Sequence, residues 1–337
     1  MTYEHYFLVT GGAGFIGSHF LVYFAEKYPH YHFTCIDKLN YATTHTRQTL
    51  TKVEKKANYR FIQCDISLEY DILYDLLVRR FPDTKITSII NFAAESSVDR
   101  SFTNPSAFVR NNILATQNLL ECLRLASDKF PQNRFTFIHI STDEVYGESE
   151  NDPPVSELAA LHPTNPYAAS KASVDMIIQS YYSSYKVPVV ILRPNNVYGS
   201  NQYPEKLIPM AIAKLRDGQK IHIHGDGTNK RTYLHVIDLV RAIEIIWREC
   251  AIAKSDMVTG GIFNVGTKDE WRNKDLVAKL IEIYHGASID LANHLEFVAD
   301  RKYNDARYRI SSEKIQRLGW EPQVNFLDGL ESLVNES

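Results

Sequence analysis

The sequence predicts an α/β fold in which a doubly wound parallel sheet is followed by a smaller C-terminal lobe. Short apolar runs alternate with helical patterns through the first part of the chain, and a glycine-rich turn follows the first run. After about Val197 this rhythm changes, and helical segments are joined by longer loops rich in Gly, Asn and His. We therefore expect a first domain at 1–197 and, at 198–337, mainly a lobe that closes over a ligand and can return one strand to the sheet.

The expected strands are short and almost continuously apolar, as in a parallel sheet that helices cover on both faces. They lie at 6–10, 33–37, 60–64, 88–93, 135–141 and 189–193. Helical patterns lie between and after them, at 15–27, 70–81, 105–126, 167–185, 205–217, 236–250 and 274–284. In the segment 167–185, the side chains of Val174, Ile178 and Tyr181 recur at helical spacing and form one apolar face.

The composition is that of an ordinary globular protein, with 44% hydrophobic residues, 23% charged residues and a net charge of −3. No run rich in Lys and Arg predicts a nucleic-acid partner, and no apolar run reaches the roughly 18 residues of a membrane-spanning helix. The first residues resemble a strand rather than a secretion signal. The four cysteines are far apart, so we expect them to be buried, reduced and structural, in a cytoplasmic protein.

A nucleotide-binding turn is predicted at 9–17, where Val-Thr-Gly-Gly-Ala-Gly-Phe-Ile-Gly follows a strand and opens a helix. Gly11, Gly14 and Gly17 permit a tight turn and a close backbone approach, which places a pyrophosphate against the N–H groups of a helix N-terminus. This arrangement is typical of Rossmann domains that bind dinucleotides. The alternative is a glycine-rich turn with no ligand.

Two acidic residues end the second and third expected strands. Asp37 follows Gly17 by about 20 residues, where a carboxylate binds the adenosine ribose hydroxyls and repels a 2′-phosphate. This favours NAD⁺ over NADP⁺, although neighbouring Lys38 works against the repulsion. Asp65 has two interpretations that stay open, a contact with the adenine edge or a plain helix cap.

Tyr167 and Lys171 stand at positions i and i+4, on one face of an expected helix. A free phenol has a pKa near ~10. A neighbouring ammonium favours the phenolate, so Tyr167 can take a proton from a substrate hydroxyl near neutral pH. By itself, the pattern Tyr-x-x-x-Lys is as often structural as it is catalytic. After a nucleotide-binding turn and several parallel strands, it indicates a catalytic pair.

Two carboxylates, Asp143 and Glu144, follow the apolar strand at 135–141, at the sheet edge where doubly wound proteins bind ligands. They suggest an acid and a base with different pKa values. The alternative is a loop-start cap or a surface acidic pair. Adjacent strand residues point to opposite faces, so both carboxylates reach one ligand only if the backbone leaves β geometry here.

Motifs spread over nearly the whole chain carry a family resemblance. They lie at 10–17, 37–39, 92–101, 141–147, 167–171, 195–199, 203–209 and 318–320. The chain resembles the extended short-chain dehydrogenase/reductase superfamily, and within it is similar to the nucleoside-diphosphate-glucose 4,6-dehydratases, since related epimerases and decarboxylases lack the Asp143-Glu144 pair. The resemblance implies NAD as cofactor, a nucleotide sugar as substrate in deoxysugar biosynthesis, and a homodimer paired through 105–126 and 167–185.

The resemblance also implies a role for each motif residue. Thr142 binds the glucosyl 4-hydroxyl beside Tyr167, which forms the catalytic pair with Lys171. Asp143 is the acid for the 6-hydroxyl, and Glu144 is the base at C5. The implied cofactor-binding residues are Gly11, Gly14, Phe15, Ile16, Gly17, Asp37, Lys38, Leu39, Asn40, Asp65, Ile66, Phe92, Ala93, Ala94, Ser96, Asn111, Tyr167 and Lys171. The implied substrate-binding residues are Ser96, Thr142, Asn196, Glu205, Lys206, Leu207, His222, His224, Arg231, Asn264, Arg301 and Asn304.

Three cations of this set, Lys206, Arg231 and Arg301, are credible ligands of a diphosphate, because guanidinium groups bind phosphate oxygens bidentately. Alone, each would more often be a solvated surface charge. No metal is implied. His222 and His224 alternate in a strand-like stretch, and we expect them to be structural or pocket-lining.

One segment departs from the bacterial dTDP-glucose pattern. Those enzymes usually carry Arg-Pro-Gly-His-Asp near the end, whereas this chain has Arg-Lys-Tyr-Asn-Asp at 301–305. The Asn-Asp ending is more similar to UDP-glucose 4,6-dehydratases, so UDP-glucose is favoured over dTDP-glucose. The alternatives are a sugar-nucleotide epimerase or decarboxylase of the same superfamily, and a non-catalytic NAD-binding regulator.

Overall fold

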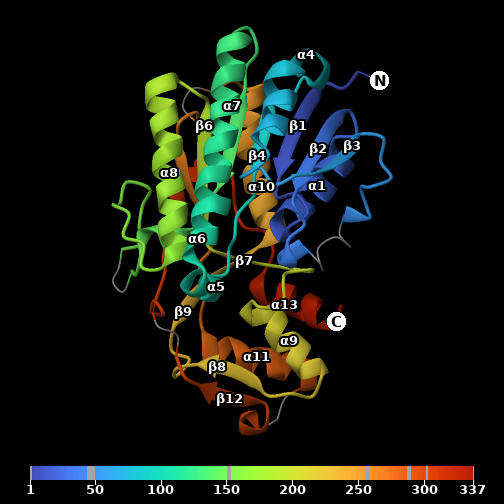
Figure 1. The fold of residues 1–337 in the computed structure, drawn as a ribbon. Coiled ribbons are helices and arrows are strands. Elements are labelled where there is room, and N and C mark those ends of the chain that lie inside the picture. The colour runs from blue at the N-terminus through green and yellow to red at the C-terminus, as the bar shows by residue number, and fades with distance from the viewer. Residues whose placement is uncertain are drawn as a thin grey trace.

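The computed structural model describes residues 2–43, 50–149, 153–255, 258–286, 290–300 and 303–336. Its large lobe is built on a seven-stranded sheet, in which every neighbouring pair is parallel and the order is β10-β6-β5-β4-β1-β2-β3 (Figure 1). The strands are β1 (His5–Thr10), β2 (Tyr31–Asp37), β3 (Tyr59–Gln63), β4 (Ser88–Asn91), β5 (Thr136–Ile140), β6 (Val189–Pro194) and β10 (Ile262–Val265). The predicted doubly wound α/β fold is confirmed.

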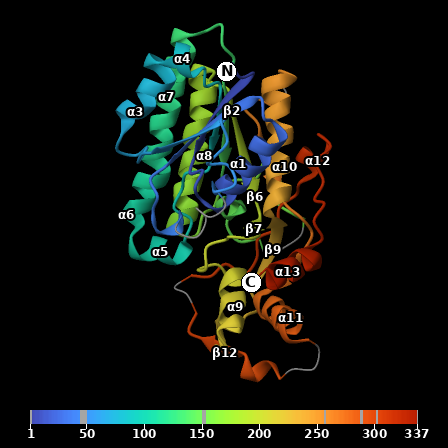
Figure 2. The ribbon, with the colours of Figure 1, turned by 90° about the vertical axis from the view of Figure 1, so that its right-hand side faces the viewer.

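Helices cover both faces of this sheet (Figures 1 and 2). On one face lie α1 (Phe15–Lys27) and α10 (Val236–Trp247), and on the other lie α3 (Tyr70–Tyr74), α7 (Ala115–Lys129) and α8 (Pro166–Tyr185). Phe20 and Trp247 belong to the apolar core of the first face, and Leu119 and Ile178 to that of the second. Because both faces are buried, the strands read as continuous apolar runs in the sequence.

The winding direction reverses between β1 and β4. From β1 the chain moves outward to β2 and β3, and it then returns to β4 on the other side of β1. The loops after these two strands therefore diverge and leave a crevice at their carboxyl ends, which is where such sheets bind ligands.

A smaller lobe lies below the carboxyl ends of the strands (Figure 1). Its core packs side chains such as Ile212, Leu280 and Leu330 from α9, α11 and α13. Its helices are α9 (Leu207–Arg216), α11 (Asn273–His285) and α13 (Phe326–Asn335), and its strands are β8 (Ile221–His224) with β12 (Leu295–Val298), and β7 (Asn196–Tyr198) with β9 (Lys230–His235) and β11 (Glu270–Arg272). The part after Val197 also supplies β10 and α10 to the large lobe.

Three segments that were each predicted as one regular α-helix are interrupted in the structure. The segment 70–81 is α3 followed by a π-helical turn (Asp75–Arg79), and α4 (Phe81–Thr84) begins anew because Pro82 has no N–H to continue the ladder. The segment 105–126 is α6 (Pro105–Phe108), a π-helical turn (Val109–Leu114) and α7. The segment 236–250 is α10 and another π-helical turn (Arg248–Ile252). An extra residue inserted in this way shifts the helix face that follows.

The predicted strand 88–93 is also too long. β4 ends at Asn91, whose side-chain oxygen accepts a hydrogen bond from the N–H of Ala93 at 3.2 Å and turns the chain out of the sheet. The remaining short helices are α5 (Val98–Thr103) and α12 (Glu313–Gln316), with 3₁₀ turns at Tyr41–Thr43, Asp143–Tyr146 and Leu291–Asn293. Within the described ranges, no helix has the length and apolar character needed to cross a membrane.

Candidate active site

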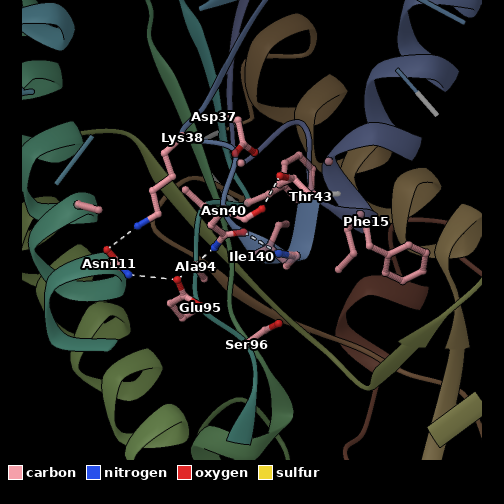
Figure 3. Close-up of a pocket in the computed structure, with 18 of the residues that line it drawn as sticks. Phe15, Asp37, Lys38, Asn40, Thr43, Ala94, Glu95, Ser96, Asn111 and Ile140 are labelled. Carbon is pink, nitrogen blue, oxygen red and sulfur yellow. Dashed lines mark hydrogen bonds between the residues drawn. The ribbon is translucent and has the colours of Figure 1, made fainter. Parts of the chain in front are cut away.

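Two neighbouring cavities open at the carboxyl ends of the strands, one over the glycine-rich turn and one facing the small lobe. Ser96, Tyr167 and Lys206 line both of them, so the two form one continuous site. Nearly all predicted cofactor-binding residues line the first cavity (Figure 3): Gly11, Gly14, Phe15, Ile16, Gly17, Asp37, Lys38, Asn40, Asp65, Ile66, Phe92, Ala93, Ala94, Ser96, Asn111, Tyr167 and Lys171.

Leu39 is the exception among these residues. Its backbone adopts a positive φ of 59°, and its side chain packs against the core under β1 and β2 rather than the cavity. Its backbone N–H is nevertheless used, because it donates to Asp37 Oδ1 at 2.8 Å. A motif match alone does not tell which way a side chain points.

The glycine-rich turn requires glycine at its first and last positions. A Cβ on Gly11 would lie 2.5 Å from the backbone nitrogen of Ala93, and one on Gly17 would lie 2.4 Å from the carbonyl oxygen of Gly11. Gly11 also has a positive φ of 67°. A bound pyrophosphate can therefore approach the backbone and the N-terminus of α1 directly, and the residues present fit a dinucleotide.

Asp37 ends β2 inside the first cavity, with its side chain 8% exposed. Its carboxylate accepts backbone N–H groups from both Ala13, at 3.0 Å, and Leu39. Each carboxylate oxygen can accept a further hydrogen bond. The side chain is thus held in one orientation while it keeps acceptor capacity for ribose hydroxyls.

A polar cluster at the other side of this cavity joins the predicted residues Lys38, Asn40, Asp65 and Asn111 to Glu95, which was not predicted. Glu95 accepts hydrogen bonds from the side-chain amides of Asn40 and Asn111, each at 3.1 Å (Figure 3). Lys38 donates to Asn111 at 2.8 Å and lies 3.5 Å from Asp65. Lys38 is therefore held away from the end of β2, and its charge is compensated within this cluster.

Asp65 caps the turn that follows β3. Its Oδ1 accepts from the backbone N–H and the hydroxyl of Ser67, at 3.0 and 2.6 Å. Burial acts to raise the pKa of Asp65, but the Ser67 hydrogen bonds and Lys38 lower it overall. The helix-cap interpretation of Asp65 matches these contacts, and the side chain also lines the first cavity.

The catalytic pair predicted on α8 lies at the junction of the two cavities. Tyr167 is 8% exposed, and it lines the second cavity together with Thr142. The predicted lowering of the Tyr167 pKa is wrong for this structure. Burial and the nearby Glu144 charge raise it, while the Lys171 amine is turned toward β5, where it contacts the carbonyl oxygen of Ile140 at 2.6 Å.

A buried network behind Lys171 sets its hydrogen-bonding state. Because Asn91 Oδ1 accepts from the Ala93 N–H, the amide nitrogen of Asn91 faces His139 Nδ1, at 3.0 Å. His139 must then carry its proton on Nε2, which lies 3.0 Å from Lys171 Nζ. Burial lowers the pKa of Lys171 to about 8, so its neutral amine, the form that can accept a hydrogen bond from His139, is reached near neutral pH.

The backbone leaves β geometry where the two carboxylates require it. β5 ends at Ile140, and the 3₁₀ turn Asp143–Tyr146 follows, with the Thr142 hydroxyl accepting the N–H of Glu144 at 3.3 Å. Thr142 and Glu144 line the second cavity. Asp143 lies behind them, 2% exposed, and its Oδ2 accepts from the side-chain amide of Asn195 at 2.7 Å.

The two carboxyl groups differ in their surroundings. Burial raises the pKa of Asp143 to about 7. Burial also raises the pKa of Glu144, but Arg231 and Lys206 stabilise its anion, as does a hydrogen bond from Asn165 at 3.2 Å. The arrangement therefore places two carboxyl groups with different surroundings beside one phenol, as an acid and a base in one site require.

Most predicted substrate residues line the second cavity: Ser96, Thr142, Asn196, Glu205, Lys206, Leu207, His222, His224, Arg231 and Asn304. Arg231 donates to Asn304 Oδ1 at 3.2 Å, and the Asn304 amide donates to Asp300 at 2.9 Å. Arg301 lies outside the described residues. Within the ranges that are described, no group of three or more His, Cys, Asp or Glu side chains is placed to hold a metal ion.

Asn264 does not reach the cavity, which corrects its predicted role. Its side chain is fully buried, accepts from the Tyr146 hydroxyl at 2.8 Å and donates to the Val155 carbonyl at 3.1 Å. Both ends of the amide are used by the fold, behind the ion pair of Arg193 and Asp175 at 2.8 Å. Asn264 thus stabilises the sheet end rather than binding a ligand.

Comparison with known proteins gives consistent matches. Residues 8–333 match the model of a family described as GDP-mannose 4,6 dehydratase. An uncharacterized protein of Schizosaccharomyces pombe is 48% identical over 99% of this chain and 98% of its own. The dTDP-D-glucose 4,6-dehydratase of Homo sapiens is 39% identical, over 97% of this chain and 88% of its own.

A trifunctional UDP-glucose 4,6-dehydratase/epimerase/reductase of Arabidopsis thaliana is 38% identical over 97% of this chain, which spans 46% of that relative. Among solved structures, dTDP-glucose 4,6-dehydratase from Streptomyces venezuelae with NAD bound has a TM-score of 0.86 at 37% identity, over 98% of this chain and 96% of that one. The UDP-glucuronic acid 4-epimerase of Bacillus cereus has a TM-score of 0.84 at 28% identity, over 98% and 99%.

Proposed function

The chain belongs to the GDP-mannose 4,6-dehydratase family, among the nucleoside-diphosphate-glucose 4,6-dehydratases of the extended short-chain dehydrogenase/reductase superfamily, and we propose that it removes water from UDP-glucose to form UDP-4-keto-6-deoxyglucose. It is an NAD-dependent hydro-lyase. The main support for this proposal is the junction of the two cavities, where Thr142, Glu144 and Tyr167 line the same space. Asp143 is buried behind Thr142 and Glu144.

Each polar group at this junction has a proposed task. Tyr167 takes the proton of the 4-hydroxyl, Glu144 takes the proton from C5, and Asp143 supplies a proton to the departing 6-hydroxyl. When bound, NAD would supply the redox chemistry: its oxidised form would take the hydride from C4, and its reduced form would return it to C6. A ketone at C4 makes the C5 proton acidic, so a carboxylate is a sufficient base only after oxidation.

The test of this function is product identity. Purified protein incubated with UDP-glucose, and separately with dTDP-glucose, should yield a nucleotide sugar lighter by one water. An epimerase, the alternative that the solved epimerase structures keep in view, would give an isomer of unchanged mass. A non-catalytic regulator would return the substrate unchanged.

The preference for UDP over dTDP rests on the Asn304-Asp305 ending. Asn304 is held by Arg231 and Asp300 at the edge of the second cavity, whereas bacterial dTDP enzymes usually carry a histidine there. The two bases differ by one methyl group, which is worth only about 1–3 kcal/mol in an apolar pocket. We expect kcat/KM to be about 10-fold higher for UDP-glucose, and a clearly higher value for dTDP-glucose would contradict the preference.

Cofactor choice follows from Asp37. Its buried carboxylate ends β2 in the first cavity, where it would meet the adenosine ribose, so a 2′-phosphate would face a like charge, which costs several kcal/mol. After removal of bound cofactor, we expect NADP⁺ to restore about 10²-fold less activity than NAD⁺. In Asp37→Ser the ratio of the activity with NAD⁺ to the activity with NADP⁺ should fall. Asp65→Ser, a matched change in the same cavity, should leave the preference for NAD⁺ in place. Equal activity of the wild type with both cofactors would refute this assignment.

A homodimer is the proposed assembly. Exposed apolar side chains, Val109, Leu114 and Met176, lie on the π-helical turn before α7 and on α8, helices that run side by side on the outside of the large lobe (Figure 1). Together they offer a surface of the kind that two subunits bury.

Analytical ultracentrifugation of the purified chain should detect a dimer. Met176→Asp should weaken it about 10²-fold, because it places a charge in the apolar interface. Phe297→Asp replaces another exposed apolar side chain, on β12, and should not weaken the dimer. A monomeric wild type would contradict the proposal. The four buried free cysteines suit a reducing compartment, and we place the enzyme in the cytoplasm.

A further inference from the structure

His139 is a buried histidine that the proposed reaction does not use. It lies on β5 and is 1% exposed. Its Nδ1 lies 3.0 Å from the amide nitrogen of Asn91, and its Nε2 lies 3.0 Å from Lys171 Nζ. The ring therefore connects the end of β4 to the catalytic pair on α8.

The side chain of Asn91 fixes the tautomer of His139. Asn91 Oδ1 accepts the backbone N–H of Ala93 at 3.2 Å and the hydroxyl of Thr10 at 2.7 Å. The opposite orientation of the amide would set its nitrogen against the Ala93 N–H, a donor against a donor. The amide nitrogen of Asn91 consequently donates to His139 Nδ1, which leaves the proton of the neutral ring on Nε2, directed at Lys171.

The amine of Lys171 receives this ring proton in only one of its two charge states. It donates to the carbonyl oxygen of Ile140 at 2.6 Å and lies 3.0 Å from His139 Nε2. A neutral amine has a lone pair that can accept from Nε2–H. An ammonium carries only donors, so it would set two hydrogens against each other. The position beside β5 therefore suits the uncharged form of Lys171.

The charged form has another position available. Lys171 also lines the first cavity, as does Tyr167, one turn before it on α8. A dinucleotide in that cavity brings hydroxyl and phosphate oxygens, which accept hydrogen bonds from an ammonium. By turning into the cavity, a protonated Lys171 would exchange an unfavourable contact with His139 for these acceptors.

We propose that His139 makes the position of the Lys171 amine depend on its charge: the neutral amine rests against His139, and the protonated amine turns into the first cavity when the cofactor binds. Lys171 Nζ takes one proton from solvent, which forms its third N–H bond. The inference rests on the proposed function, in which Lys171 assists Tyr167. An ammonium favours the phenolate, so the base becomes active only with bound cofactor, and His139 is a positioning residue that acts through Lys171.

Burial supports a neutral amine in the absence of cofactor. It lowers the pKa of Lys171 to about 8, although Asp175 on α8 acts to raise it. Asp175 is itself paired with Arg193 of β6 at 2.8 Å. Burial also lowers the pKa of His139, which keeps the ring neutral. The other titratable groups at this end of α8 are Tyr167, Asp143 and Glu144. The charged groups that line the first cavity are Asp37, Asp65, Glu95, Glu205, Lys38 and Lys206.

Calorimetric titration with NADH, in buffers of different ionisation enthalpy, counts the protons taken up on binding. NADH is chosen because its nicotinamide ring is uncharged, and Tyr167→Phe is the background because the phenol can release a proton of its own. After removal of bound cofactor, about one proton per site should be taken up at about pH 9 and almost none at about pH 6.5, where the free amine is already protonated. The affinity for NADH should fall about 10-fold from the lower pH to the higher.

Three substitutions in this background locate the proton. Lys171→Met removes the amine and should abolish the uptake. In His139→Gln the amide can turn its oxygen to the ammonium, so Lys171 should already be protonated without cofactor, and the uptake at about pH 9 should fall to less than about half. His32→Gln, which changes a half-buried histidine on β2 of the same sheet, should leave the uptake unchanged.

The tautomer of His139 is a second readout, which needs no substitution in the protein measured. In nitrogen NMR of the cofactor-free wild type, with the ring signals assigned by their loss in His139→Gln, we expect the proton on Nε2. A proton on Nδ1, or an uptake that His139→Gln leaves unchanged, would overturn the proposal and leave His139 as a structural residue. A protein that shows the uptake but forms no dehydrated product would overturn the proposed function alone.

Discussion

Replacing Tyr167 with Phe should lower the rate of C4 oxidation about 10³-fold, in the middle of the range for loss of a general base. The variant keeps the ring that packs near Phe108 but removes the phenol oxygen that is proposed to take the 4-hydroxyl proton. The measurement is the NADH absorbance formed in a single turnover with UDP-glucose. Product should be almost absent over the same time.

The control for this experiment is Tyr185→Phe, on the same helix but exposed at its far end. It should oxidise C4 at the wild-type rate. If Tyr167→Phe formed NADH within a few-fold of the wild type, the phenol would not be the base, and the proton of the 4-hydroxyl would have to leave by another group.

Replacing Glu144 with Gln should separate the two halves of the reaction. Oxidation at C4 does not need this carboxylate, so NADH should appear and persist. The C5 proton should not exchange in deuterated water, because no base removes it, and overall dehydration should slow about 10³-fold. The amide is nearly the same size and retains an oxygen that can accept from Asn165, so the fold should be little changed.

Glu95→Gln provides the matched control, because Glu95 is a second buried carboxylate in the same cleft but lies among the cofactor-facing amides. That variant should retain C5 exchange. Rapid C5 exchange in Glu144→Gln would show that the base is misassigned, and retention of full activity would remove the argument for the Asp143-Glu144 pair altogether.

The large lobe was largely predictable because its strands are buried on both faces. The apolar runs at β1, β2 and β5 and the helix α1 differ from the predictions by at most two residues at an end. The short strands of the small lobe were harder to find. β8 alternates buried and exposed side chains over only four residues, with His222 and His224 exposed, and its partner β12 is distant in the sequence.

The helix interruptions could not be predicted from periodicity. The π-helical turn Val109–Leu114 carries Asn112 inward, where its amide bonds both backbone polar groups of Glu95, at 2.7 and 3.1 Å. Nothing in the local pattern indicates this partner, which lies on a loop after β4. A pairing between distant segments decides the structure here, and single-sequence periodicity does not contain it.

In the site, the residues that belong to a sequence motif were predicted, but the buried residues that hold them in place were not. Asp37, Tyr167 and Lys171 line the cleft as expected. Asn91 and His139 were read only as parts of apolar strands, although a buried polar residue inside such a run is itself a signal of a network. Asn264 matched a motif but turned away from the cleft, since motif spacing carries no information on side-chain direction.

In the proposed reaction, hydride leaves C4 and returns to C6 of the same sugar, with loss of water. The most direct test is UDP-glucose deuterated at C4, incubated with the purified holoenzyme and analysed by NMR and mass spectrometry. We predict a 4-keto-6-deoxy product that has lost one water and carries the deuterium in its C6 methyl group. Deuterium retained at C4 in a product of unchanged mass would indicate an epimerase and contradict the dehydratase assignment.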